Sequence, residues 1–257
     1  MDELKLSSAH EGVGGKILFS DFDGTLYFRD EIEKTRANIE AIRKWRSLGH
    51  QFCITTGRSY KSVTTELPQI RELCDCYIVD SGSIVMSKTG ELLHVFYFKP
   101  EVVSELIEFS KGFSEVPVPF YYTPDSENID YKTEGVTKLR FWFKDPSLLE
   151  EATTRINNSF PVSAIFQEVI SNKKELLGLQ GFIEIIPLES GKSNAIRFLQ
   201  GLRGISTDDI ITVGDGLNDL GMIRDFNGFA IEGSKLSNIY PELKTVSTVA
   251  SLTLKMI

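Results

Sequence analysis

The alternation of short apolar runs with helical stretches limits what this chain can fold into more than any other feature of its sequence. Apolar runs at 17–19, 52–54 and 77–79 are separated by helical spacing over 31–48 and by a second helical stretch that ends near residue 73. Short apolar runs between helices are typical of buried parallel strands. The βαβαβ order therefore predicts an α/β fold with a Rossmann-like core, in which helices cover both faces of a parallel sheet in three layers.

The middle of the chain departs from this alternation. Apolar runs at 84–86 and 92–98 flank Lys88-Thr89-Gly90, which is typical of a hairpin. The segments that follow are predicted as a helix over 101–111, strands near 118–123 and 137–143, a helix over 147–157, and strands near 161–167 and 181–186. The αββαββ order predicts an α+β unit with two helices on one face of an antiparallel sheet. We therefore expect an inserted domain over 84–184, with chain crossings near Gly82 and 187–190, in a core of residues 1–83 and 185–257.

The α/β alternation returns after this insertion. A helix is predicted from about 191 to 203, a strand over 210–213, a helix over 217–225 and a strand over 229–231. From about residue 244 to the end, the sequence gives no clear assignment.

Charge and composition exclude several classes of protein. The chain has 28 Lys and Arg against 36 Asp and Glu, a formal net charge of -8, which argues against a nucleic-acid partner. No stretch reaches the ~18–20 consecutive apolar residues of a membrane span. The polar N-terminus, residues 1–15, lacks the apolar core of a signal peptide, so we expect a cytoplasmic protein. The sequence does not indicate an oligomeric state.

The cysteines give little sign of a disulfide or a metal site. There are three, Cys53, Cys74 and Cys76, and two of them are only one residue apart. The histidines occur singly along the chain. We interpret the cysteines as reduced, buried thiols rather than as a disulfide framework.

Four polar clusters lie where predicted strands end or a helix begins. Asp21 and Asp23 follow the first strand, and Thr56 follows the second. Asp215 follows the strand at 210–213, and Lys192 lies just after the apolar run at 183–186. Ligands of open parallel sheets bind outside the carboxyl ends of the strands, so we expect these clusters to meet in one site.

The segment Asp21-Phe22-Asp23-Gly24-Thr25 carries the most chemical information. Two carboxylates at a spacing of two repel each other, and a divalent cation relieves that repulsion. Oxygen ligands suit Mg²⁺, which also neutralises a substrate phosphate. One aspartate can then attack phosphorus, and the other can act as a general acid and base. Gly24 lets the backbone approach a phosphate closely. The alternative for this segment alone is a turn or a helix cap.

The other clusters supply groups that suit a phosphate. Thr56-Gly57-Arg58 offers a hydroxyl, an open backbone N–H and a guanidinium. Lys192 places a cation at a helix start, against the helix dipole, so a phosphoryl group or Asp21 should hold it there. In Gly214-Asp215-Gly216-Leu217-Asn218-Asp219, Asp215 can reach a metal, while Asn218 and Asp219 can orient the lysine. Helix capping and a surface lysine are the alternatives for these segments.

Together the four segments resemble the motifs of the haloacid dehalogenase superfamily of phosphohydrolases. Asp21–Thr25 matches DxDGT, Ile54–Gly57 matches the strand that ends in Thr-Gly, Lys192 matches the motif lysine, and Gly214–Asp219 matches GDGxND. The insertion looks like the cap of the Cof-type branch, which includes sucrose-phosphatase-like enzymes. Two features depart from this pattern. Asp80-Ser81-Gly82 stands where close relatives often carry Asn-Gly, and the C-terminal tail lacks the usual Asp-Gly-Val.

The resemblance implies a role for each matching residue. Asp21 would be the nucleophile, and Asp23 would be the acid and base. Thr56 and Lys192 would hold the phosphoryl group. The implied ligands of Mg²⁺ are Asp21, the backbone carbonyl of Asp23, and Asp215, with Asp219 supporting metal-bound waters. The residues predicted to bind the phosphate or the substrate are Gly24, Thr25, Gly57, Arg58, Asn218 and, in the insertion, Arg140.

Three functions are compatible with these residues. The first is a phosphatase that acts on a small phosphorylated metabolite, such as a sugar phosphate, through an aspartyl-phosphate intermediate. The second is a phosphomutase of the phosphomannomutase type, whose second phosphate clamp would come from Lys132, Lys138 and Arg140. The third is a non-catalytic protein that binds a phosphometabolite, and loss of a motif residue would indicate it. All the motif residues are present here.

Overall fold

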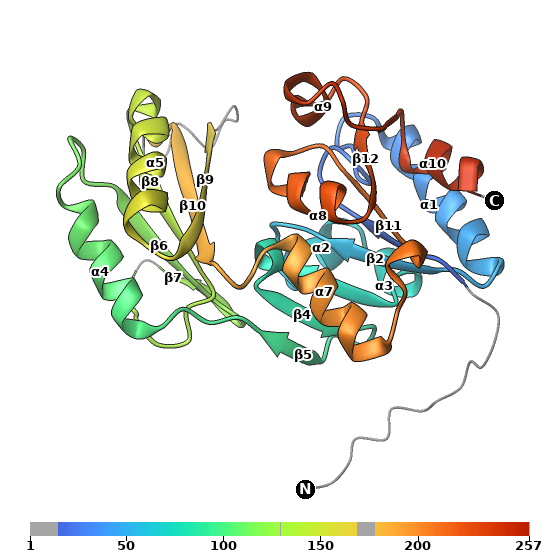
Figure 1. Ribbon diagram of the computed structural model, residues 1–257, viewed down its shortest axis with the longest axis horizontal. Helices are drawn as coiled ribbons and strands as arrows, with labels where there is room; N and C mark the ends of the chain where they lie inside the picture. Colours follow the sequence, from blue (N-terminus) through green and yellow to red (C-terminus); the bar gives the residue numbers. More distant parts are fainter. Residues whose placement is uncertain (1–14, 129, 169–177, 257) are drawn as a thin grey trace, which may run out of the picture.

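A computed structural model describes residues 15–128, 130–168 and 178–256. Figure 1 shows two sheets, each with its own helices, joined by two crossings of the chain. The polar segment 1–14, on which the expectation of no signal peptide depended, lies outside the described residues. Among the helices that are described, none is long and apolar enough to cross a bilayer.

The first sheet has eight strands in the described part of the chain, in the order β13-β12-β11-β1-β2-β3-β4-β5. Its parallel strands are β1 (Ile17–Ser20), β2 (Gln51–Thr55), β3 (Cys76–Val79), β11 (Ile210–Gly214), β12 (Asn227–Ile231) and β13 (Thr245–Val246). The strands β4 (Ile84–Ser87) and β5 (Leu92–Val95) are antiparallel. The predicted α/β core with a mainly parallel sheet is confirmed.

Helices cover both faces of this sheet, which gives the three layers expected. One face carries α1 (Ile32–Ser47), α2 (Tyr60–Glu66), α3 (Ile70–Leu73) and α10 (Val249–Met256). The other face carries α7 (Lys192–Arg203), α8 (Leu220–Asp225) and α9 (Lys235–Ile239). In α1, the helical spacing places Ile39, Ile42 and Trp45 against the sheet, where all three are buried.

The second sheet is antiparallel, in the order β7-β6-β8-β10-β9. Its strands are β6 (Val118–Thr123), β7 (Ser126–Asn128), β8 (Lys138–Phe143), β9 (Val162–Glu168) and β10 (Gly181–Pro187). The helices α4 (Pro100–Ser110) and α5 (Leu149–Ser159) pack on one face. Figure 1 places them on the side away from the first sheet, so the open face of the second sheet looks toward it. We call residues 99–187 the cap and the other described residues the core.

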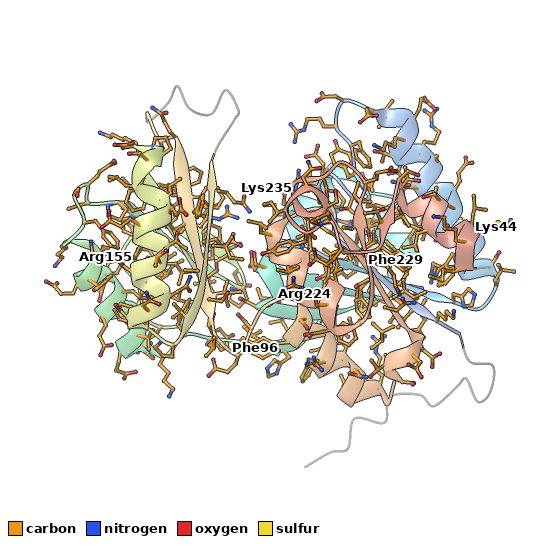
Figure 2. The ribbon with its side chains drawn as sticks, turned by 45° about the horizontal axis from the view of Figure 1, so that its top comes forward. Lys44, Phe96, Arg155, Arg224, Phe229 and Lys235 are labelled. Carbon is orange, nitrogen blue, oxygen red and sulfur yellow. A yellow bond between two sulfur atoms is a disulfide. The ribbon has the colours of Figure 1, made fainter. Side chains whose placement is uncertain are left out.

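The predicted hairpin forms, but it belongs to the core. The strand β4 pairs with β3, and β5 pairs with β4, so residues 84–95 extend the first sheet. The chain leaves this sheet only after β5, past Phe96 between the two units (Figure 2), and reaches the cap at α4. The expected crossing at Gly82 is therefore wrong. A Cβ on Gly82 would lie 2.2 Å from the carbonyl carbon of Gly191, so this glycine permits a close contact within the core.

The cysteines also differ from expectation. Cys53 and Cys76 form a disulfide, whereas we expected reduced thiols. The two residues are register partners on β2 and β3, with their Cα atoms 5.0 Å apart. Spacing along the chain cannot reveal this pairing, because strand register brings together residues that are 23 positions apart. Cys74 is a buried free thiol, as expected.

The unassigned C-terminal stretch forms β13 and α10. Thr248 and Ser251 cap the helix reciprocally: the N–H of Thr248 donates to Ser251 Oγ at 3.1 Å, and the N–H of Ser251 donates to Thr248 Oγ1 at 3.0 Å. Val249 and Leu252 are buried beside the residues of α1. The tail therefore completes one helical layer of the core.

Candidate active site

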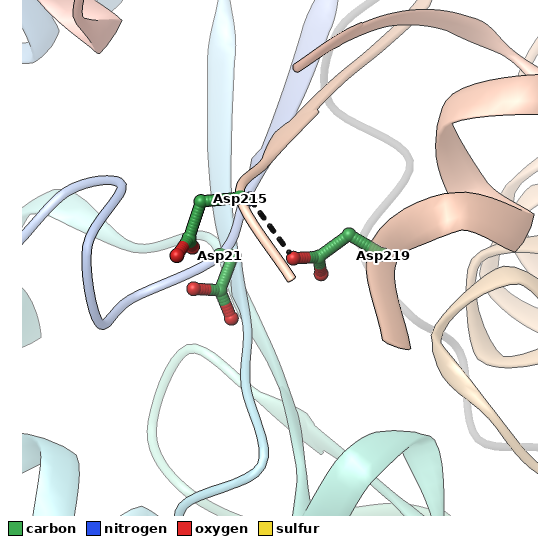
Figure 3. Close-up of side chains that lie close together, drawn as sticks. All are labelled: Asp21, Asp215 and Asp219. Atoms are coloured by element: carbon green, nitrogen blue, oxygen red, sulfur yellow. Dashed lines mark hydrogen bonds between the residues drawn. The ribbon is translucent and has the colours of Figure 1, made fainter. Parts of the chain in front are cut away.

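Neighbouring parallel strands bring the first and last acidic clusters together. The strands β1 and β11 are adjacent, and the N–H of Asp21 donates to the carbonyl of Val213 at 2.9 Å. Asp21 and Asp215 therefore leave the sheet side by side, with Asp219 facing them from the turn after β11 (Figure 3). One carboxylate oxygen from each of the three aspartates lies within 4.8 Å of the other two. The site lies at the carboxyl edge of the sheet, as the sequence predicted.

Lys192 joins two of these aspartates. It is the first residue of α7, its side chain is 1% exposed, and its Nζ lies 2.5 Å from both Asp21 Oδ1 and Asp219 Oδ1. Burial opposes the charge on the ammonium, but the two carboxylates raise its pKa above the ordinary value. These ion pairs hold a cation at a helix start despite the unfavourable helix dipole.

The loops around the aspartates are shaped by hydrogen bonds and by glycine. Thr25 Oγ1 donates to Asp215 Oδ1 at 2.8 Å. Asp219 Oδ2 accepts from the N–H groups of Asp215 at 3.1 Å and of Gly216 at 2.9 Å. Gly24 has φ +76, and a Cβ there would lie 2.6 Å from Asp215 Oδ2. The Asp-Gly-Thr sequence is therefore what allows this loop to approach Asp215.

The cluster has more negative charge than its lysine can balance. Burial raises the pKa of Asp21, and the carboxylates of Asp219 and Asp215 raise it further, while Lys192 lowers it. Burial and the charge of Asp219 likewise raise the pKa of Asp215, to about 6. Three carboxylates against one ammonium leave two negative charges when all are ionised. An all-oxygen site with that charge fits a divalent cation such as Mg²⁺.

Asp23 lies apart from this cluster and is paired with Arg58. The guanidinium donates from Nε to Asp23 Oδ2 at 2.7 Å and from Nη2 to Oδ1 at 2.6 Å. The Asp23 side chain is 53% exposed, so the pair lies at the open side of the site. Arg58 Nη1 also donates to Glu66 Oε2 at 3.3 Å. A residue predicted to bind phosphate thus contacts the residue predicted to act as acid and base.

Seven of the predicted core residues line one large cavity, whereas Gly24, Thr25, Lys192 and Asp219 do not. This cavity, of about 1090 Å³, extends between the core and the cap. From the core it is lined by Asp21, Asp23, Thr56, Gly57, Arg58, Asp215 and Asn218. Thr56 follows β2, and its Oγ1 accepts from the N–H of Arg58 at 3.1 Å. Among the predicted supports of Lys192, Asp219 contacts it directly, whereas Asn218 borders the cavity.

Comparison with protein families agrees with this geometry. The model of the haloacid dehalogenase-like hydrolases matches residues 18–235. The chain belongs to this family. The 5-amino-6-(5-phospho-D-ribitylamino)uracil phosphatase YwtE of Bacillus subtilis is 25% identical over 272 residues, which cover 91% of each chain.

Solved structures of family members share the whole fold. BT1666, a phosphatase of the haloalkanoate superfamily from Bacteroides thetaiotaomicron, has a TM-score of 0.75 at 18% identity, over 97% of this chain and 98% of that one. The subclass IIB sugar phosphatase BT4131 has a TM-score of 0.70 at 20% identity, over 94% of this chain and 97% of that one. The inserted cap is therefore part of a fold that known family members share.

The cap side of the cavity contains Arg140 together with residues that the sequence analysis missed. Arg140 lines the cavity, but its Nε and Nη2 donate to Glu184 Oε2 at 2.9 and 2.6 Å. Glu184 also accepts a hydrogen bond from Ser81 of the core. A lone carboxylate within the apolar run Phe182-Ile183-Glu184-Ile185-Ile186 was a signal that could have identified it. Tyr122, Glu127 and Gln167 line the same wall.

Proposed function

We propose that this haloacid dehalogenase-like hydrolase is a Mg²⁺-dependent phosphatase of a small phosphorylated metabolite, such as a sugar phosphate. The observation that carries the proposal is the cluster of Asp21, Asp215, Asp219 and Lys192, of which Asp21 and Asp215 line the cavity. Its carboxylates suit a divalent cation, and its open side has room for a phosphorylated sugar. We also propose that residues 99–187 act as a cap domain that governs which substrate enters.

Asp21 is the proposed nucleophile. Lys192 holds its Oδ1, so Oδ2 is the oxygen that forms the bond to phosphorus. As that bond forms, the bond from phosphorus to the leaving oxygen breaks, and Asp23 donates a proton to that oxygen. Asp23 then accepts a proton from water as the water attacks phosphorus, which breaks the bond to Asp21 and releases phosphate.

Asp21, Asp215 and the backbone carbonyl of Asp23 are the proposed ligands of Mg²⁺. The ion supplies charge neutralisation to the phosphate and to the crowded carboxylates when it is bound. Lys192, Thr56 and the N–H of Gly57 hold the phosphoryl oxygens. Asp219 fixes Lys192 and the backbone of Asp215 and Gly216.

The cap contacts favour a phosphatase over a mutase. A mutase needs a second phosphate clamp, for which Lys138 and Arg140 were candidates. Lys138 is 1% exposed and lies 3.1 Å from Asp80, and Arg140 is paired with Glu184. Lys132 is exposed. The complete set of motif residues argues against a protein that only binds a phosphometabolite.

The test is release of phosphate from a substrate panel. Purified protein with Mg²⁺ is assayed against phosphorylated sugars, phosphorylated sugar alcohols and the ribityl phosphate named for YwtE, without a bisphosphate activator. We expect turnover of at least one of these that is lost in Asp21→Asn and retained in Asp208→Asn, a control on the exposed surface. Isomerised sugar phosphate in place of free phosphate would indicate the mutase. If neither free phosphate nor an isomerised product forms from any substrate of the panel, the proposal is contradicted.

A further inference from the structure

One cap lysine reaches into the core and contacts the loop that follows β2. Lys138 is the first residue of β8, and its side chain is 1% exposed. Its Nζ donates to the carbonyl of Gly57 at 3.0 Å and to Asp80 Oδ1 at 3.1 Å. Burying an ammonium is costly unless polar partners compensate its loss of water. The two core contacts supply hydrogen bonds to it, and within the cap its Nζ lies 4.4 Å from the centroid of the Tyr122 ring.

These contacts complete the support of the loop Thr56-Gly57-Arg58. The carbonyl of Thr56 accepts from the N–H of Ser81 at 2.9 Å, and the carbonyl of Arg58 accepts from the N–H of Asp80 at 2.9 Å. The carbonyl of Gly57, between them, accepts from Lys138. All three loop carbonyls therefore have a donor, and the middle donor alone comes from the cap.

Asp80 and Ser81, whose N–H groups support the loop, contact the cap as well. Asp80 and Ser81 adopt positive φ values of 48° and 60°, which are uncommon for residues other than glycine. Ser81 donates to Glu184 of β10, and Glu184 Oε2 lies 3.8 Å from Lys138 Nζ. Asp80 and Ser81 thus present their backbone N–H groups to the loop and their side chains to the cap.

We propose that Lys138 is a positioning residue through which the cap orders the phosphate-binding loop Thr56–Arg58. The assignment of this loop to phosphate rests on the proposed function. Lys138 borders the cavity, but its Nζ is held by the Gly57 carbonyl and by Asp80 rather than left open to substrate. It fixes the peptide unit between Gly57 and Arg58, whose N–H donates to Thr56 Oγ1 at 3.1 Å, and through it the Thr56 hydroxyl proposed to face the phosphate. Loss of Lys138 should therefore weaken the binding of every phosphorylated substrate to the same degree, whatever its leaving group.

Two variants separate this role from a contribution to folding alone. Lys138→Met keeps the length of the side chain but leaves Asp80 buried without its cation, so we expect a fall in melting temperature. The double variant Lys138→Met/Asp80→Asn removes both charges, and asparagine tolerates a positive φ. We expect it to recover most of the melting temperature, although the Gly57 carbonyl still lacks its donor. Lys144→Met, at the exposed residue that directly follows β8, is the matched control.

Two measurements are made on each full-length variant. Hydrogen–deuterium exchange reports the order of the peptide that contains Thr56–Arg58, and calorimetry with inorganic phosphate and Mg²⁺ reports phosphate binding without turnover. In the double variant we expect faster exchange in that peptide, about tenfold weaker phosphate binding, and equal relative losses of kcat/KM for an aryl phosphate and a sugar phosphate. Lys144→Met should match the wild type.

A double variant that recovers both melting temperature and phosphate affinity would overturn the proposal, since Lys138 would then be only structural. Unchanged exchange in the Thr56–Arg58 peptide would overturn it too. Failure of the proposed function is distinguishable, because a wild-type protein without phosphatase activity would still report loop order through exchange.

Discussion

Arg58 holds both carboxylate oxygens of Asp23, at 2.7 and 2.6 Å, at the open side of the proposed active site. The guanidinium orients the carboxylate in this pair through two parallel hydrogen bonds. To protonate a leaving group, Asp23 must exchange this partner for the substrate. Arg58 is then free to contact the phosphate, so the two predicted roles of Arg58 and Asp23 depend on each other.

Substitution at this pair should affect substrates according to their leaving groups. We expect Asp23→Asn to lower kcat for sugar phosphates by ~10²–10⁴-fold, the usual contribution of a general acid or base. Arg58→Ala should lower kcat/KM by about 10–100-fold, since one charge-assisted interaction is lost. The loss in Asp23→Asn should be smaller for formation of the phosphoenzyme from an aryl phosphate, whose leaving group needs no proton. A plot of single-turnover rate against leaving-group pKa measures this. Equal losses for all leaving groups would assign Asp23 to binding or folding.

Activity should require Mg²⁺, because the three clustered carboxylates exceed the charge of Lys192. Ca²⁺ should support it poorly, since its looser coordination does not impose the same in-line geometry. Asp215→Asn should raise the Mg²⁺ concentration needed for half-maximal activity. The measurement is initial rate against metal concentration after chelation. Full turnover in excess chelator would exclude the proposed metal site.

Arg140 should influence substrate choice rather than chemistry, because it lies on the cap wall of the cavity. We expect Arg140→Ala to raise KM for a bulky sugar phosphate and to leave KM for a minimal aryl phosphate nearly unchanged. Arg155→Ala is the control, since Arg155 lies on the far side of the cap (Figure 2). Equal losses of activity on both substrates would mean that Arg140 contributes to folding or to the catalytic core. No effect on either substrate would mean that Arg140 does not contact the substrate.

The ionic contacts of Glu184 within the cap should make the stability of the protein depend on pH. Burial opposes ionisation of Glu184, but Lys138, Arg140 and Ser81 hold its pKa at about 2, below its ordinary value of 4.5. Because the folded pKa is lowered, this carboxylate stabilises the fold above pH 4.5 and loses that contribution as the pH falls toward 2. The loss should be on the order of 3 kcal/mol. Asp80 also forms an ion pair with Lys138, so it interacts with the same ammonium as Glu184.

The measurement compares unfolding free energy of the wild type and of Glu184→Gln across this pH range. The difference between them should be largest near neutral pH and should shrink as the pH falls. A difference that does not change with pH would mean that folding leaves the pKa of Glu184 unshifted, and a difference that grows as the pH falls would mean that folding raises it; either would contradict the prediction.

The sequence predicted the core and its site because the relevant signals are local. The apolar run before Asp21 and the helical spacing of Ile39, Ile42 and Trp45 report burial directly. Asp21, Lys192 and Asp215 could be placed together because Asp21 and Asp215 follow strands of one sheet and Lys192 begins a helix that packs on it. The missed features depend on which strands become neighbours. The pairing of Cys53 with Cys76, of β4 with β3, and of Lys138 with Asp80 each joins residues whose contact no local pattern encodes.

Trapping the phosphorylated protein tests the central claim, the aspartyl phosphate on Asp21, most directly. In Asp23→Asn, an aryl phosphate should still transfer its phosphoryl group to Asp21, whereas attack by water should be slow, so the adduct should accumulate. Mass spectrometry of the acid-quenched protein should then find one added phosphoryl group, on the peptide that contains Asp21. Asp21→Asn/Asp23→Asn should carry none. Turnover of Asp23→Asn with no adduct on Asp21, and with inversion at a chiral phosphorus in the wild type, would contradict the account.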